Sequence, residues 1–214
     1  EDLPDETARL LHRFARGGGG VLFVGASGSG DLEAWREIWE DQLPIQLRAE
    51  PRRGFAESAV RVGLAGLAHE ITVVDESPVA TEEAWAALPP VLIPAGAYAT
   101  VPGAVTLLTA QTTSPAREVP LMAIAPVGAG RVGVITARGL WRWDFSMSAT
   151  GRDLPLAREF WRRTMRWISE PSQTDRFLVR PLRNVFQDSE PVAFTARLAD
   201  EAYEPVAGAR VRIE

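Results

Sequence analysis

Apolar residues recur along the chain with two periods, one typical of helices and one typical of strands. Within residues 5–16 they recur at helical spacing, acidic residues come first and arginines come last. That order of charges stabilises both ends of a helix dipole, and glycines at 17–20 can end the helix. The pattern therefore predicts a helix over residues 5–16.

Three more helices are expected, over residues 32–41, 81–88 and 155–168. The last carries the clearest pattern, a wide apolar stripe made of Leu156, Phe160, Trp161, Met165 and Ile168. The opposite face, which we expect to face water, carries Arg158, Arg162, Arg163 and Arg166.

Strand patterns lie between these helices. Residues 21–24 form a short apolar run bounded by glycines, which is typical of a buried strand in a parallel sheet. Residues 60–62 and 105–108 predict further strands. Residues 119–126 and 131–136 flank a glycine-rich turn and predict a hairpin.

The composition changes after residue 170. Apolar and polar residues alternate over 192–198 and again over 209–213, which indicates antiparallel strands with one polar face. A complete immunoglobulin-like sandwich needs ~100 residues. We therefore expect an α/β domain over 1–170 and the beginning of an antiparallel β-sandwich over 175–214.

Composition excludes several chemistries. The 214 residues hold no cysteine, so disulfides, thiol nucleophiles and cysteine-bound metals are excluded. The formal net charge is −5, which disfavours binding to nucleic acid. The two histidines, His12 and His69, and scattered carboxylates give no metal-ligand spacing. We expect no cofactor and no metal, and we expect His12 to be solvated.

Several segments in order resemble one family, the class I glutamine-amidotransferase-like domains of bacterial membrane-anchored proteins, many of which carry a von Willebrand A-type domain. These segments are Gly18–Gly25, His69-Glu70-Ile71-Thr72, Trp85 with Leu88-Pro89-Pro90, Pro120-Leu121-Met122, Gly128–Val132, Leu140–Trp143 and Phe160–Trp167. Glu70 stands where the family usually has proline. The stretch from Arg183 to Ile213 resembles the β-sandwich that often follows such domains.

The resemblance implies a flavodoxin-like, class I amidotransferase-like sheet with helices on both faces, whose first strand precedes residue 1. It also implies an extracytoplasmic location, partners among envelope proteins or other domains of the same chain, and membrane contact only through segments outside these residues. The catalytic cysteine of true amidotransferases is missing here, and Ala137-Arg138-Gly139 follow the strand expected at 131–136 without a histidine. We therefore expect a non-catalytic scaffold or interaction module.

Ser27 lies in a glycine-rich loop after the first strand and suggests an alternative, a hydrolase or a domain that binds a carbohydrate-related ligand with Ser27 and carboxylates such as Asp144. The G-x-S-x-G elbow pattern fails at Ser29. The same loop matches no phosphate-binding motif. A loop that needs glycine for its turn is the simpler interpretation.

The candidate interaction residues are Ser27, Arg138, Trp141, Arg142, Trp143 and Asp144. Tryptophan and arginine often anchor interfaces, so the segment 141–144 can be a recognition surface. The alternative, which we favour, is a buried clamp: Trp141 and Trp143 pack on the helix at 155–168, and Arg142 pairs with Asp144 or a nearby carbonyl.

Overall fold

The computed structural model describes residues 4–25, 35–39, 42–47, 54–95, 98–113, 116–143, 156–170, 177–181, 194–198 and 206. The chain divides into two compact units, Glu1–Pro171 and Ser172–Glu214. The first is a mixed α/β unit. In the second, β10 (Phe177–Pro181) pairs antiparallel with β11 (Phe194–Leu198).

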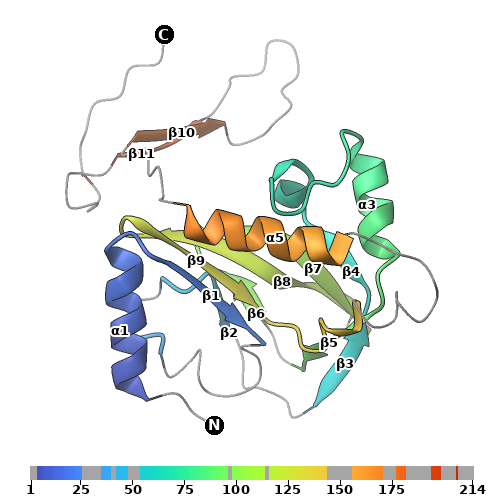
Figure 1. The fold of residues 1–214 in the computed structure, drawn as a ribbon, viewed down its shortest axis with the longest axis horizontal. Coiled ribbons are helices and arrows are strands. Elements are labelled where there is room, and N and C mark those ends of the chain that lie inside the picture. The colour runs from blue at the N-terminus through green and yellow to red at the C-terminus, as the bar shows by residue number, and fades with distance from the viewer. Residues whose placement is uncertain are drawn as a thin grey trace. The chain divides into compact units, whose positions relative to one another are not determined.

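A five-stranded sheet forms the centre of the first unit (Figure 1). Its order is β1-β9-β8-β7-β4. The strands are β1 (Gly20–Val24), β4 (Val60–Val62), β7 (Val105–Thr113), β8 (Ala116–Val127) and β9 (Gly130–Ile135). Only β1 and β9 are parallel, and the other three pairings are antiparallel. The predicted strands at 21–24, 60–62 and 105–108 and the predicted hairpin are confirmed, but the sheet is mixed.

Two small antiparallel sheets add to the unit. In one, β2 (Ile45–Leu47) pairs with β6 (Tyr98–Thr100); in the other, β3 (Phe55–Ser58) pairs with β5 (Val91–Pro94). The β3–β5 pair brings residues of two separate chain segments beside Arg138, which forms an isolated bridge with Leu92.

Helices cover both faces of the central sheet. On one face, α1 (Asp5–Arg16) packs through Ala8 and Ala15 against Val132 of β9. On the other, α5 (Leu156–Ser169) packs with Ile135, and Figure 1 shows it lying over the strands. The turn η1 (Leu64–Ala68) and helix α3 (Pro78–Ala86) join the α5 side.

Two helix predictions and the prediction that His12 is solvated need correction. Helix α3 begins at Pro78, earlier than residue 81, because the Ser77 hydroxyl caps it by accepting a hydrogen bond from the Ala80 N–H. Of the expected helix over 32–41, residues 35–39 are described, and they form a turn. His12 is buried against Trp39, with 5.1 Å between the ring centroids, so it is not solvated.

The apolar stripe of α5 differs in detail from the expected one. Its buried residues are Leu156, Ala157, Phe160, Thr164 and Trp167. Met165 is 47% exposed and Trp161 is half-buried. The buried positions follow helical spacing around Phe160 and Trp167, so they share one face of α5. The large side chains of Phe160 and Trp167 turn this face toward the sheet.

Glycines let α1 and α5 approach the sheet closely. A Cβ atom on Gly20 would lie 1.8 Å from the carbonyl oxygen of Ile168, and one on Gly130 would lie 2.2 Å from the carbonyl oxygen of Ala15. Beside them, Arg131 donates to the Trp167 carbonyl oxygen at 2.7 Å and lies 5.0 Å over the Trp167 ring. Gly20 and Gly130, which belong to segments that suggested the family, are thus places where the helices pack closely on the sheet.

Candidate functional site

The carboxyl ends of the two parallel strands meet at one edge of the sheet. Gly25, which follows β1, donates its N–H to the Ile135 carbonyl oxygen of β9 at 2.9 Å and has a φ of 69°. Arg138 lies beside this turn, because a Cβ on Gly25 would be 3.7 Å from its Cγ. Carboxyl ends of parallel strands are the usual place for ligands in α/β sheets.

Arg138 is fixed through its main chain. Its N–H donates to Leu92 of β5 at 2.8 Å, and its carbonyl oxygen accepts from the Leu92 N–H at 3.0 Å. The guanidinium carbon lies 4.8 Å over the ring of Phe55, which is 44% exposed. A guanidinium over the face of an aromatic ring is held there by cation–π attraction.

Arg142 and Trp141 continue the same surface. Arg142 pairs with Glu57 at 2.7 Å, and the side chain of Glu57 is 60% exposed. The Arg142 guanidinium lies 6.0 Å from the centre of the Trp141 ring. Trp141 is 63% exposed. We call the five residues Phe55, Glu57, Arg138, Trp141 and Arg142 the strand-end patch.

Trp143 lies beneath this surface and is buried, as expected. It is 1% exposed, and its indole N–H donates to the Pro89 carbonyl oxygen at 3.1 Å. Its ring contacts Trp85 and Phe160, at centroid distances of 5.9 and 5.8 Å. Trp143 therefore clamps the turn that carries Arg142 to α5 and α3.

The prediction that Trp141 is also buried is wrong. Residues 140–143 form a helical turn, in which the N–H of Trp143 bonds to the Leu140 carbonyl oxygen at 3.1 Å. Positions three apart share a face of such a turn, so Leu140 and Trp143 are both buried. Trp141 then points to the opposite side of the turn. In a strand, Trp141 and Trp143 would instead share one face.

The structure brings Arg138, Trp141 and Arg142 together above Trp143. Ser27 and Asp144 lie outside the described residues. Arg142 pairs with Glu57, 85 positions earlier in the chain, and its predicted pairing with Asp144 falls outside the described residues. Phe55 and Glu57 were missed because their short segment, β3, has no periodic pattern that marks it.

A second charged region lies on α5. Glu159 accepts hydrogen bonds from Arg162 at 2.7 and 2.5 Å and from Arg163 at 2.5 Å. Hydrogen bonds from Arg162, and then from Arg163, lower the pKa of Glu159 from 4.5 to about 2. Glu159 is therefore ionised at neutral pH, and its charge is already shared by two arginines.

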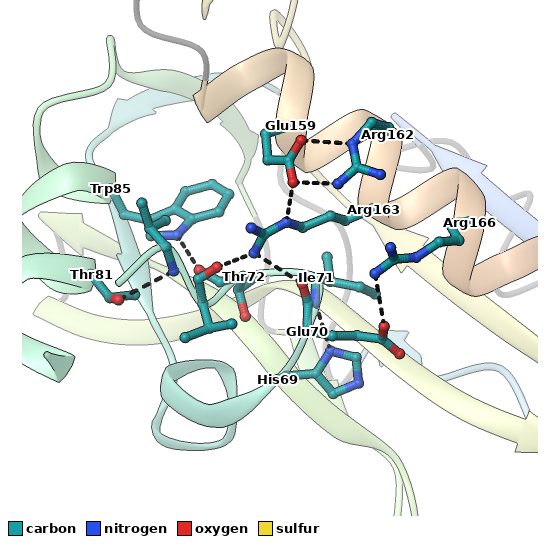
Figure 2. A network of polar contacts seen from close by, with 12 residues as sticks. His69, Glu70, Ile71, Thr72, Thr81, Trp85, Glu159, Arg162, Arg163 and Arg166 are labelled. Atoms are coloured by element: carbon teal, nitrogen blue, oxygen red, sulfur yellow. Dashed lines mark hydrogen bonds and ion pairs between the residues drawn. The ribbon is translucent and has the colours of Figure 1, made fainter. Parts of the chain in front are cut away.

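Arg163 connects α5 to the segment before α3 (Figure 2). Its guanidinium donates to the carbonyl oxygens of Val73 and Glu70. Arg166 pairs with the Glu70 carboxylate at 3.2 Å. Arg163 is 24% exposed, so it is not the solvated residue expected from its position on the polar face.

The motif at His69–Thr72 supports this connection. The Ile71 N–H donates to His69 Nδ1 at 3.2 Å, and the Thr72 hydroxyl donates to the Gly66 carbonyl oxygen at 2.6 Å. The buried Trp85 donates its indole N–H to the Thr72 carbonyl oxygen at 2.8 Å. Figure 2 shows these bonds. They give His69 and Trp85 structural roles.

A cavity of about 500 Å³ opens between this segment, α3 and α5, and we call it the α5 groove. Its lining residues are Ile71, Val73, Val74, Ala84, Ala87, Leu156, Arg158, Glu159, Phe160, Arg162 and Arg163. Among the described residues, no group of three histidine, aspartate or glutamate side chains is arranged to hold a metal.

The chain matches no protein-family model and no curated protein. It is similar to Cytoplasmic Protein STM1381 from Salmonella typhimurium LT2, at 15% identity and a TM-score of 0.52 over 77% of this chain and 61% of that chain. Cytoplasmic Protein STM3548 from Salmonella typhimurium matches at 14% identity and a TM-score of 0.49 over 76% of this chain and 60% of that chain. The chain thus spans about three fifths of the proteins it matches, and the first likeness shows a shared fold.

The comparison overturns the expected location. The extracytoplasmic location came from the family resemblance and from no signal within these residues, whereas the similar structure from Salmonella typhimurium LT2 is named a cytoplasmic protein. In the part of the chain that the structure describes, no helix is long and apolar enough to span a bilayer.

Proposed function

We propose that this chain is a non-catalytic binding module, with a flavodoxin-like, amidotransferase-like architecture, that holds a protein partner on the strand-end patch. One observation carries the proposal. An exposed tryptophan and two arginines stand at the carboxyl ends of the parallel strands, on a turn that the buried Trp143 anchors. Exposed tryptophan is costly for solubility and is enriched where interfaces have their strongest contacts.

The chemistry of the patch favours a partner that presents a carboxylate beside an aromatic side chain. Arg138 and Arg142 place two planar guanidinium groups in the patch, and Glu57 pairs with Arg142. The exposed faces of Trp141 and Phe55 supply stacking surfaces. Another domain of the same polypeptide or a separate protein could present such a segment.

The absence of cysteine from these residues supports a role without thiol chemistry. The amidotransferase reaction needs a thiolate that attacks the glutamine amide and an imidazole that activates it. The patch instead consists of two aromatic rings, two guanidinium groups and a carboxylate, which suits binding.

Site-specific photo-crosslinking in the native cells tests the proposal. A benzophenone amino acid replaces Phe55 on the patch or, as the matched control, Phe14 on α1, which is 58% exposed. We expect one discrete adduct from position 55, none from position 14, and loss of the adduct when Trp141→Ala or Arg142→Glu is added.

Two results would contradict the proposal. One is equal labelling from positions 55 and 14, because the patch would then have no partner of its own. The other is turnover of glutamine or of common esters and amides by the purified chain that Ser27→Ala abolishes. The second result would favour the hydrolase alternative.

A further inference from the structure

The α5 groove has the size and lining of a ligand pocket. Its volume of about 500 Å³ lies within the ~300–1,000 Å³ of small-molecule sites. Aliphatic side chains and the ring of Phe160 line it, and two of these lining residues, Phe160 and Ile71, are 1% and 2% exposed. The groove is separate from the strand-end patch in its lining residues.

The walls of the groove are held in place before any ligand arrives. Arg163 joins α5 to the carbonyl oxygens of Val73 and Glu70, and Trp85 joins α3 to Thr72. Figure 2 shows the Arg163 guanidinium between Glu159 and this segment. A preformed cavity loses little conformational freedom on binding.

The charges at the rim favour an anion. Arg158, Arg162 and Arg163 line the groove together with one carboxylate, Glu159. Glu159 already accepts from Arg162 and Arg163. Arg158 is exposed and bonds to none of the residues that the structure describes, so its guanidinium is free for a ligand.

We propose that the α5 groove binds a small amphipathic carboxylate, with its alkyl chain along the apolar walls and its carboxylate at Arg158. At ~30 Å³ for each non-hydrogen atom, the share of one water molecule in the liquid, 500 Å³ holds roughly 15 such atoms. An unbranched carboxylate of about 8–12 carbons fits this volume. The positive rim excludes an alkyl cation of the same length.

Isothermal titration calorimetry with decanoate tests the proposal, because it needs no reporter inside the groove. We expect saturable one-to-one binding, and binding of decyltrimethylammonium weaker by about tenfold or more. Arg158→Glu should weaken decanoate binding by about tenfold or more. Ala87→Phe, which fills the groove from an exposed position, should abolish it.

Arg9→Glu on α1 is the matched control, because Arg9 is also an exposed helical arginine. It changes the overall charge equally but should alter the affinity less than about twofold, since distant surface charges are screened. Thermal unfolding of each variant verifies that it folds.

Several outcomes would overturn the proposal. They are no saturable decanoate binding, equal binding of the alkyl cation, or equal losses in Arg158→Glu and Arg9→Glu. Self-association of the chain that Ala87→Phe removes and decanoate does not affect would assign the groove to a second copy. None of these results bears on the strand-end patch.

Discussion

The α5 groove and the strand-end patch both carry arginines, but the two regions use them differently. In the groove, Arg163 bonds to two main-chain carbonyl oxygens and to Glu159, so its charge joins α5 to the segment before α3. In the patch, Arg142 lies beside the exposed Trp141 and pairs with a carboxylate that is 60% exposed. The partner of each arginine therefore separates a structural role, that of Arg163, from the recognition role that we propose for Arg142.

The two tryptophans near the patch give the sharpest test of this comparison. Trp143→Ala should lower the free energy of unfolding by ~3–5 kcal/mol, because the ring is buried among Trp85 and Phe160. Trp141→Ala should change it by less than ~0.5 kcal/mol, since that ring faces solvent. Urea denaturation of both variants measures the difference. Similar losses would mean that Trp141 also belongs to the core.

The arginines provide the next largest contrast. Arg163→Ala should cost ~1–2 kcal/mol, because it leaves the carbonyl oxygens of Val73 and Glu70 without a charged donor. Arg142→Ala removes a surface ion pair and should cost less than ~0.5 kcal/mol. Denaturant midpoints of the two variants measure these losses of stability. Equal losses in Arg142→Ala and Arg163→Ala would remove the distinction between the two regions.

The smallest expected effect is a pH dependence confined to the groove. The pKa of Glu159 is about 2 in the folded chain, below its ordinary value of 4.5, because Arg162 and Arg163 hydrogen-bond to the carboxylate. A lowered folded pKa contributes stability that is present in full above pH 4.5 and is lost as the pH falls toward 2. The contribution is small, since water screens this half-exposed group.

Comparison of the wild-type chain with Glu159→Gln at pH 6 and pH 3 measures this contribution. We expect the difference in urea midpoint between the two chains to shrink at pH 3. A difference that stays constant would show that the pKa of Glu159 is not lowered by folding, against the expectation.

Elements with local patterns could be predicted from the sequence, and those that depend on distant partners could not. The ends of α1 and the position of the β8–β9 hairpin follow from charges and glycines within a few residues. The pairing of β3 with β5 could not be foreseen, because β3 has no apolar run to mark it and Phe55 pairs with Pro94, a distant residue in the sequence.

The site shows the same limit. Arg138, Trp141 and Arg142 were selected by residue type, and the structure brings them together. The partner of Arg142 lies 85 positions away, and the carbonyl oxygen of Val73 lies 90 positions from Arg163. Side chains that bond across such separations have no nearby signal, so the groove was missed entirely and Arg163 was assigned to solvent.

The parallel pairing of β1 with β9 has a consequence for the order of folding. Gly20 pairs with Arg131 about 110 residues later, and closing so long a loop is entropically slow. The antiparallel neighbours β7, β8 and β9 are contiguous in sequence and can pair through short turns. We expect this three-stranded meander to form the folding nucleus, with α1 and β1 joining last. Destabilising substitutions in β1 should then accelerate unfolding while leaving the folding rate almost unchanged.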